Sequence, residues 1–365
     1  AGYGLISDCR NYGNITVTNN KNFEKNLMVG GIVAYYNTNA QTKDYFGKDF
    51  LVNCANYGNI TVEFPETVQP KNVYVGGVLG TTAYHKSTAA VEHGRITDCY
   101  NFGNVKYHFK KLAGGTYGNV GGVIGYAEAN IQYCCNYGKV EYTVPVGERT
   151  VGGTRPGVGG VVATATYTVF YCENYGEVYV EGVWAGGTDD NAGAGAYAGA
   201  VFGGVVGCAG IFEVTDSTEK VKNCTNYGKF TTKYYCLATG GTATSQGGVV
   251  GYSQMAVEDC SNEGVVDINT YNKNTYVGGV VGNSPYNVTR CDNNGSVSLT
   301  LMGMTAETAS FRAGGVVGYC TKTISNCNNT GTVTTNCDGV EKTGITIYSA
   351  SVVGDGYVID GCSNS

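Results

Sequence analysis

Cysteine has the widest chemical range of the residues that recur in this sequence, because a thiolate can attack a carbonyl, bind a metal or form a disulfide. The chain of 365 residues has 15 cysteines, and ten of them begin one phrase, Cys-x-Asn-Tyr-Gly-x-Val or a variant of it. No two cysteines have the Cys-x-x-Cys spacing of a zinc site, and the three histidines lie outside the phrases. We therefore expect no metal and no cofactor. The phrase cysteines are Cys9, Cys54, Cys99, Cys134, Cys172, Cys224, Cys260, Cys291, Cys327 and Cys362.

An asparagine follows each of these cysteines two positions later. Asparagine tolerates the left-handed backbone that a sharp corner needs, and stacked amides can hydrogen-bond to one another along a column. We expect a structural ladder of asparagines at a corner, with the glycine two positions later as a second flexible corner. The ladder residues are Asn11, Asn56, Asn101, Asn136, Asn174, Asn226, Asn262, Asn293, Asn329 and Asn364.

The residue after the asparagine is aromatic in the first six phrases and polar in the later ones, where Glu263, Asn294 and Thr330 replace it. A position that accepts such different residues is expected to face the surface. Two interpretations stay open. The rings bind a glycan or a partner, or they reflect only strand propensity and stacking on one another. The six aromatic residues are Tyr12, Tyr57, Phe102, Tyr137, Tyr175 and Tyr227.

Catalytic carboxylates are the next chemistry to consider, because glycosidases and polysaccharide lyases need acidic or basic groups clustered on one face. The residue before the phrase cysteine is acidic at Asp8, Asp98 and Asp259, but never in two consecutive repeats. The recurring double glycines lack the Gly-x-Gly-x-x-Gly spacing of a phosphate-binding loop. We expect no enzyme, with a polysaccharide lyase or glycoside hydrolase as the alternative.

A second phrase, Val-Gly-Gly-Val-Val-Gly, alternates with the cysteine phrase along the whole chain, as in VGGVLG from Val75 and VGGVVG from Val277. Each repeat then offers three short strands: one before the cysteine, one after the Asn-Tyr-Gly turn and one in the Gly-Gly-Val-Val run. The paired glycines imply close backbone approach or a bend. This pattern predicts an all-β fold, a parallel β-helix (β-solenoid) of about nine to ten coils. We expect residues 1–365 to form one continuous domain, a segment of a longer chain.

Inserts interrupt the repeat near residues 36–50, 84–92 and 181–201. The longest contains the single tryptophan, Trp184, together with Asp189 and Asp190. Because loops carry function on a rigid scaffold, these residues are candidates for a sugar-binding platform or for a contact that depends on a metal ion. The alternative is a Gly/Ala-rich excursion without function.

The remaining cysteines lie outside the ladder. Side chains that stand parallel in register have poor geometry for a disulfide, so we expect the ladder thiols to be mostly free and buried. The other five are the better disulfide candidates: Cys135, Cys208, Cys236, Cys320 and Cys337.

Charge and hydropathy exclude two classes of partner. Only 14% of residues are charged, the net charge is −6, and no run of lysine or arginine is present. We therefore expect no nucleic-acid binding. No stretch approaches the roughly 18 apolar residues of a membrane-spanning helix, so we expect no membrane insertion in this segment.

The combined pattern resembles the GLUG-motif repeats of bacterial cell-surface proteins, and VGGVIGYAEANIQYCCNYGKV (Val120 to Val140) is a close match. The resemblance implies an extracellular or cell-surface protein in which the solenoid serves as a structural or adhesive region beside other domains. The motif is structural, so it implies no catalytic residues. A first alternative is a fibre subunit that self-associates end to end, since neither end shows a polar cap. A second is a carbohydrate-binding or carbohydrate-active β-helix.

Overall fold

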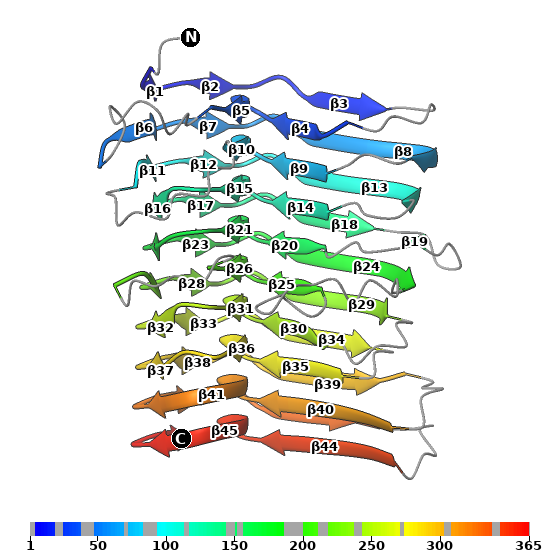
Figure 1. Cartoon of the computed structure of the whole chain (residues 1–365), viewed down its shortest axis with the longest axis vertical. Coiled ribbons are helices and arrows are strands. Elements are labelled where there is room, and N and C mark those ends of the chain that lie inside the picture. Colours follow the sequence, from blue (N-terminus) through cyan, green and yellow to red (C-terminus); the bar gives the residue numbers. More distant parts are fainter. Residues whose placement is uncertain are drawn as a thin grey trace.

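The computed structural model is an all-β stack of coils, in which each coil lies against the next through parallel strand pairs (Figure 1). Within the described residues the chain forms strands and turns and no helix. The fold is a parallel β-helix, as the repeat predicted. The structure describes residues 4–18, 25–37, 47–68, 72–82, 93–112, 117–143, 150–151, 156–185, 200–210, 218–236, 243–270, 274–302, 308–337 and 344–364.

The shortest strands contain the ladder asparagines and stack into one sheet, the asparagine sheet. We number the coils 1 to 10 by these strands. They are β2 (Arg10–Asn11), β7 (Ala55–Asn56), β12 (Tyr100–Asn101), β17 (Cys135–Asn136), β23 (Glu173–Asn174), β28 (Thr225–Asn226), β33 (Ser261–Asn262), β38 (Asp292–Asn293), β42 (Asn328–Asn329) and β46 (Ser363–Asn364).

The strand after the Asn-Tyr-Gly turn belongs to a second sheet, the post-turn sheet. Its β-branched and aromatic residues alternate between buried and outward positions, as expected for strands with one face in a core. The strands are β3 (Ile15–Thr18), β8 (Ile60–Val68), β13 (Val105–Leu112), β18 (Val140–Thr143), β19 (Thr150–Val151), β24 (Val178–Ala185), β29 (Phe230–Cys236), β34 (Val266–Thr270), β39 (Val297–Leu301) and β43 (Val333–Asn336).

A third sheet, the pre-glycine sheet, faces the post-turn sheet and leads into the double glycine. Its strands are β4 (Leu27–Gly30), β9 (Asn72–Gly76), β14 (Tyr117–Gly121), β20 (Gly157–Gly159), β25 (Val201–Gly203), β30 (Thr244–Gly247), β35 (Asn274–Gly278), β40 (Thr308–Gly314) and β44 (Gly344–Ala350).

Two further rows of strands complete each coil. The post-glycine row is β5 (Val33–Tyr36), β10 (Leu79–Thr82), β15 (Ile124–Ala127), β21 (Val162–Ala165), β26 (Val206–Ala209), β31 (Val250–Ser253) and β36 (Val281–Ser284). The pre-cysteine row is β1 (Ile6–Ser7), β6 (Asp49–Val52), β11 (Arg95–Thr97), β16 (Asn130–Gln132), β22 (Val169–Phe170), β27 (Lys220–Lys222), β32 (Ala256–Glu258) and β37 (Val288–Thr289). The rows merge in β41 (Val317–Ser325) and β45 (Val353–Asp360).

The strands predicted before the cysteine and after the turn are therefore confirmed, whereas the Gly-Gly-Val-Val run contains the end of one strand, a bend and the start of the next. Most coils thus have two more short strands than predicted, because the glycine run is divided and because the asparagine forms a two-residue strand of its own. Figure 1 shows the equivalent strands of successive coils lying above one another. Equivalent residues are thus in register, as with Asn101 and Asn136.

Two apolar cores run along the stack. One lies between the post-glycine and pre-cysteine rows and contains the ladder cysteines, with residues such as Leu79 and Ile96. The other lies between the post-turn and pre-glycine sheets and contains larger residues, including Phe64, Tyr107 and Phe202. The repeated valines thus form continuous buried columns, which is what stacking of identical positions requires.

The asparagine ladder and the double glycine meet between these cores and form a waist. A Cβ placed on Gly122 would lie 2.0 Å from the carbonyl oxygen of Gly160 and 2.3 Å from Cγ of Asn136. On Gly121 it would lie 1.9 Å from the carbonyl oxygen of Ile124. Other parts of the backbone lie so close to these two glycines that neither position has room for a side chain. Of the two explanations expected for the glycine pair, close backbone approach is therefore confirmed.

The predicted corner was wrong by three residue positions. The left-handed residue in each coil is the one before the cysteine, as with Asp8 (φ 58°) and Asn53 (φ 48°), whereas the described ladder asparagines form short strands. The glycine of the Asn-Tyr-Gly turn is not a left-handed corner either. A Cβ on Gly103 would lie 2.0 Å from the carbonyl oxygen of Gly58, so this glycine allows close contact between coils.

Candidate functional site

The asparagine ladder is an unbroken chain of side-chain hydrogen bonds through all ten coils. The Nδ2 of each asparagine donates to Oδ1 of the asparagine in the next coil, at 2.7 to 3.1 Å. The same Nδ2 also donates to the carbonyl oxygen of the glycine two positions later, as in Asn136 to Gly138 at 2.7 Å. The amide donors are therefore used within the ladder, and its chemistry is structural.

The ladder cysteines are buried thiols. From Cys54 to Cys327 they are at most 1% exposed, and the sulfur lies near the carbonyl oxygen two residues earlier, as in Cys134 Sγ to Gln132 O at 3.3 Å. Burial raises the pKa of the Cys134 and Cys260 thiols well above the ordinary range. A neutral thiol without access to solvent is a poor nucleophile, so Cys134 and Cys260 act as small apolar residues.

Outside the ladder, Cys135, Cys208 and Cys320 are free thiols, so the disulfides considered for these three are not formed. Cys337 packs against the core of larger residues, and the side chain of Cys236 lies outside the described residues. Burial raises the pKa of Cys208 to about 12. Burial, followed by the charge of Glu173, raises the pKa of Cys135 to about 11. Neither thiol is activated for catalysis.

The six aromatic residues form a continuous stack on the outside of the asparagine sheet. Successive ring centroids are 4.7 to 4.9 Å apart, and the ring planes differ by 3° to 11°. The rings are exposed to solvent, from 42% at Phe102 to 74% at Tyr12. The position faces the surface, as the mixture of residue types predicted.

This geometry limits what the stack can bind. Because each inner ring is covered on both faces by its neighbours, it presents only its edge to solvent, together with a hydroxyl where the residue is tyrosine. A sugar that stacks on an aromatic residue needs an open ring face, and here the row offers one only at its two ends. The stacking interpretation accounts for the row, and glycan binding along it would have to use hydroxyl hydrogen bonds.

In the C-terminal coils polar side chains continue the same column. Asn294 Nδ2 donates to both carboxylate oxygens of Glu263, at 2.9 and 3.0 Å, and Thr330 Oγ1 donates to Asn294 Oδ1 at 2.8 Å. Hydrogen bonds between side chains thus replace ring stacking. Contacts between neighbouring coils thus also occur in this column from coil 7 to coil 9, with a different chemistry.

The left-handed corner column, which was considered for catalytic carboxylates, contains two unusual residues. Tyr133 (φ 54°) and Tyr171 (φ 49°) occupy positions that other coils fill with Asp, Asn or Gly, apart from Arg290. A bulky residue there costs about 1–2 kcal/mol. Their rings stack at 5.3 Å, and both are 44% exposed. The recurrence of Asp and Asn before the cysteine was the signal for this corner.

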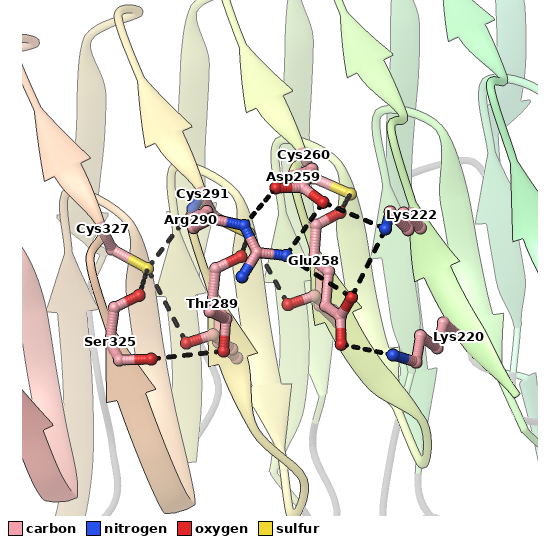
Figure 2. A network of polar contacts seen from close by, with 12 residues as sticks. Lys220, Lys222, Glu258, Asp259, Cys260, Thr289, Arg290, Cys291, Ser325 and Cys327 are labelled. Atoms are coloured by element: carbon pink, nitrogen blue, oxygen red, sulfur yellow. Dashed lines mark hydrogen bonds and ion pairs between the residues drawn. The ribbon is translucent and has the colours of Figure 1, made fainter. Parts of the chain in front are cut away.

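An ion-pair network crosses the pre-cysteine row of coils 6 to 8 (Figure 2). Lys220 Nζ lies 2.7 Å from Glu258 Oε1, and Lys222 Nζ lies 3.4 Å from Asp259 Oδ2. Arg290 contacts the Asp259 carboxylate with two nitrogens, at 2.5 and 3.0 Å. Glu258 and Asp259 are thus adjacent carboxylates with cationic partners. Asp259 has a lowered pKa, caused first by its hydrogen bond with Arg290. It remains ionised, which does not suit a general acid.

The insert residues contribute little to a described site. The backbone of Trp184 belongs to β24 and pairs with Thr150 and Cys236, but its side chain lies outside the described residues. Asp189 and Asp190 also lie outside them, as do the insert 84–92 and the central parts of the other two. Within the described ranges, no three His, Cys, Asp or Glu side chains gather as metal ligands. The same ranges contain no helix with the length and apolarity needed to cross a bilayer.

Comparison with known proteins gives no relative for this chain: no protein-family model, curated protein or solved structure matches it.

Proposed function

We propose that this chain is a non-catalytic structural or adhesive segment of a bacterial cell-surface protein. The observation that supports this role best is the asparagine ladder, which links every coil to the next through buried amide groups. Such a column resists local opening, because breaking it anywhere leaves polar groups without partners inside the waist. A stiff stack of coils can hold other domains, or its own outer faces, away from a surface.

The cell-surface location is supported by the resemblance of the repeat to GLUG-motif proteins. Low charge and buried free thiols suit a scaffold, and the adjacent carboxylates of Glu258 and Asp259 are held in ion pairs in the network of Figure 2. The stacked rings and the outward columns give the solenoid long, regular faces on which a partner could dock. These features fit a scaffold better than a catalyst.

The location can be tested with an antibody raised against residues 1–365. Intact cells of the source organism should bind the antibody, and brief protease treatment of those cells should remove the signal. A cytoplasmic protein followed in parallel controls for leakage. Labelling that appears only after the cells are permeabilised would rule out the surface role.

The non-catalytic character needs a separate test. The purified chain should release no product from a panel of acidic and neutral polysaccharides, measured by reducing ends and by absorbance of unsaturated sugars. Turnover of any of them that is lost with a point substitution on the solenoid would favour the carbohydrate-active alternative.

A further inference from the structure

We propose that the corner column of coils 3 to 5 binds arginine side chains of a partner protein, with the carboxylate of Asp98 as the anion and the ring of Tyr133 as the stacking surface. This site lies on the outside of the solenoid, beside the stacked aromatic row. The proposal adds a ligand to the adhesive part of the proposed function. It rests on that function in one respect, namely that this face of the solenoid meets other macromolecules.

The Asp98 carboxylate is the first element of the site. Within the described residues its hydrogen-bond partner is the neighbouring hydroxyl of Thr97, at 3.2 Å, and no cation lies against it. The equivalent corner aspartates differ in this respect. Asp259 holds the guanidinium of Arg290 in the next coil, and Asp8 accepts the amide of Asn53 at 2.6 Å. Asp98 therefore has the acceptor capacity that its counterparts have already used.

The open face of Tyr133 is the second element. Tyr133 is the corner residue of coil 4, next to Asp98 in coil 3, because Gln132 pairs with Thr97. Tyr171 in coil 5 covers one face of the ring, at 5.3 Å and 8°. The other face therefore points toward coil 3 and Asp98. A carboxylate beside an open tyrosine face is the arrangement that a guanidinium recognises by a charged hydrogen bond and by stacking.

This fold uses the same chemistry for its own arginines. Arg312 lies 5.0 Å from the ring centroid of Tyr276 and 4.8 Å from that of Tyr319, and its Nε is 2.7 Å from Asp355 Oδ2. Arg290 occupies, beside Asp259, the corner position that Tyr133 occupies beside Asp98. Arg290 thus shows that a guanidinium suits the corner carboxylate, and Arg312 shows that it suits a carboxylate beside tyrosine rings.

The surroundings favour a protein partner. Tyr171, Tyr137 and Tyr175 are each 42% to 44% exposed, and Glu173 adds a second carboxylate, which accepts the hydroxyl of Tyr175 at 2.8 Å. Tyrosine and arginine are the residues enriched where protein interfaces are buried, and tyrosine loses little entropy on binding. Tyrosine in the left-handed conformation is also strained, which is typical of positions kept for function. Arginine is preferred to lysine because its planar group both stacks and pairs with two oxygens.

The test uses the full chain and two fluorescent peptides of equal length, one of Gly-Arg repeats and one of Gly-Lys repeats. Fluorescence anisotropy at low ionic strength should show the arginine peptide binding more tightly, and added salt should weaken it. Asp98→Asn and Tyr133→Asn should each weaken binding of the arginine peptide roughly two- to fivefold. Both variants should fold, because asparagine is the native corner residue at positions 53, 223 and 326.

Asp292→Asn serves as the matched control, since it removes one exposed carboxylate from coil 8 and should leave binding unchanged. Equal affinity for the two peptides, or unchanged affinity in Asp98→Asn, would overturn the proposal. So would binding of neutral oligosaccharides at this face without binding of the arginine peptide. Because these measurements use purified protein, their failure would leave the cell-surface role standing, and antibody labelling of cells would still decide that question.

Discussion

At the scale of single residues, the ladder asparagine combines two tasks in one side chain. Asn136 Nδ2 donates to Asn174 in the next coil and to Gly138 in its own, while its Oδ1 accepts from Asn101. A hydrophobic residue at this position would fill space but would take a hydrogen-bond partner from three polar groups in neighbouring coils and in its own. This is why the residue recurs in every coil.

Replacing Asn136 by alanine should therefore be strongly destabilising. The substitution takes one partner each from Asn101 Nδ2, Asn174 Oδ1 and the carbonyl oxygen of Gly138. We expect a loss of roughly 2–4 kcal/mol in the free energy of unfolding, measured by urea denaturation followed by circular dichroism. Asn104→Ala is the matched control, because this asparagine is exposed and accepts a single backbone hydrogen bond from Lys139. Equal losses in the two variants would mean that the ladder is unimportant.

The ladder could be predicted from sequence because an identical residue at one phrase position must stack on itself in a solenoid. The backbone conformation of the ladder asparagine was predicted wrongly. The prediction used the preference of asparagine for left-handed corners, but other residues of the same phrase share that preference. Asp8, Asn53 and Asp98, one position before the cysteine, show the same preference and occupy the actual corner. Where Tyr133 and Tyr171 replace them, propensity gives no indication of a corner, and only the register of the repeat does.

At the scale of elements, the waist depends on strands that approach more closely than side chains permit. The second glycine of each pair faces the asparagine ladder, so the two phrases that alternate in the sequence are partners across the coil. The sequence showed that the double glycine recurs with the asparagine, but not that they touch. Their contact joins strands that are separated by many residues in each repeat.

Gly122→Ala tests this contact directly. The added Cβ would lie 2.0 Å from the backbone oxygen of Gly160, which cannot move without shifting a neighbouring coil. We expect the variant to lose several kcal/mol of stability or to fail to accumulate as folded protein. Gly118→Ala, four residues earlier, is the control, because its nearest neighbour would be a Tyr142 ring carbon at 3.4 Å. A stable Gly122→Ala protein would contradict the close packing of the waist.

The ion-pair network of Figure 2 makes a prediction about pH at the same scale. The hydrogen bond from Arg290 lowers the pKa of Asp259. A carboxyl whose pKa is lower in the folded state contributes stability above its unfolded pKa, about 3.9, and loses it as the pH falls through the folded value. The contribution should therefore be complete at neutral pH and disappear below about pH 4.

An NMR titration of the Asp259 carboxyl carbon checks this prediction. In the native protein its pKa should lie below the ordinary aspartate range, and in Arg290→Asn it should move back toward that range, because the guanidinium is gone while the corner conformation is kept. An unchanged pKa in the variant would show that Arg290 is not the main cause.

At the scale of the whole molecule, the fold follows from repetition. Each coil buries its apolar residues against the neighbouring coils. The asparagine, cysteine, aromatic and glycine columns all favour the same register between coils, and this register specifies the entire stack. This is why two short phrases predicted the parallel β-helix and its number of coils. The inserts could not be predicted in the same way, because residues such as Trp184 have no equivalent in other coils and nothing repeats from which to infer their place.

The central claim is that equivalent asparagines of successive coils are joined inside the molecule, and hydrogen exchange of their side-chain amides measures this most directly. In protein labelled with ¹⁵N-asparagine, the buried ladder amides should exchange far more slowly than an exposed one such as that of Asn104. The amide protons of Asn101 should also show a nuclear Overhauser effect to those of Asn136. Uniformly fast exchange, with no contact between these two side chains, would contradict the account.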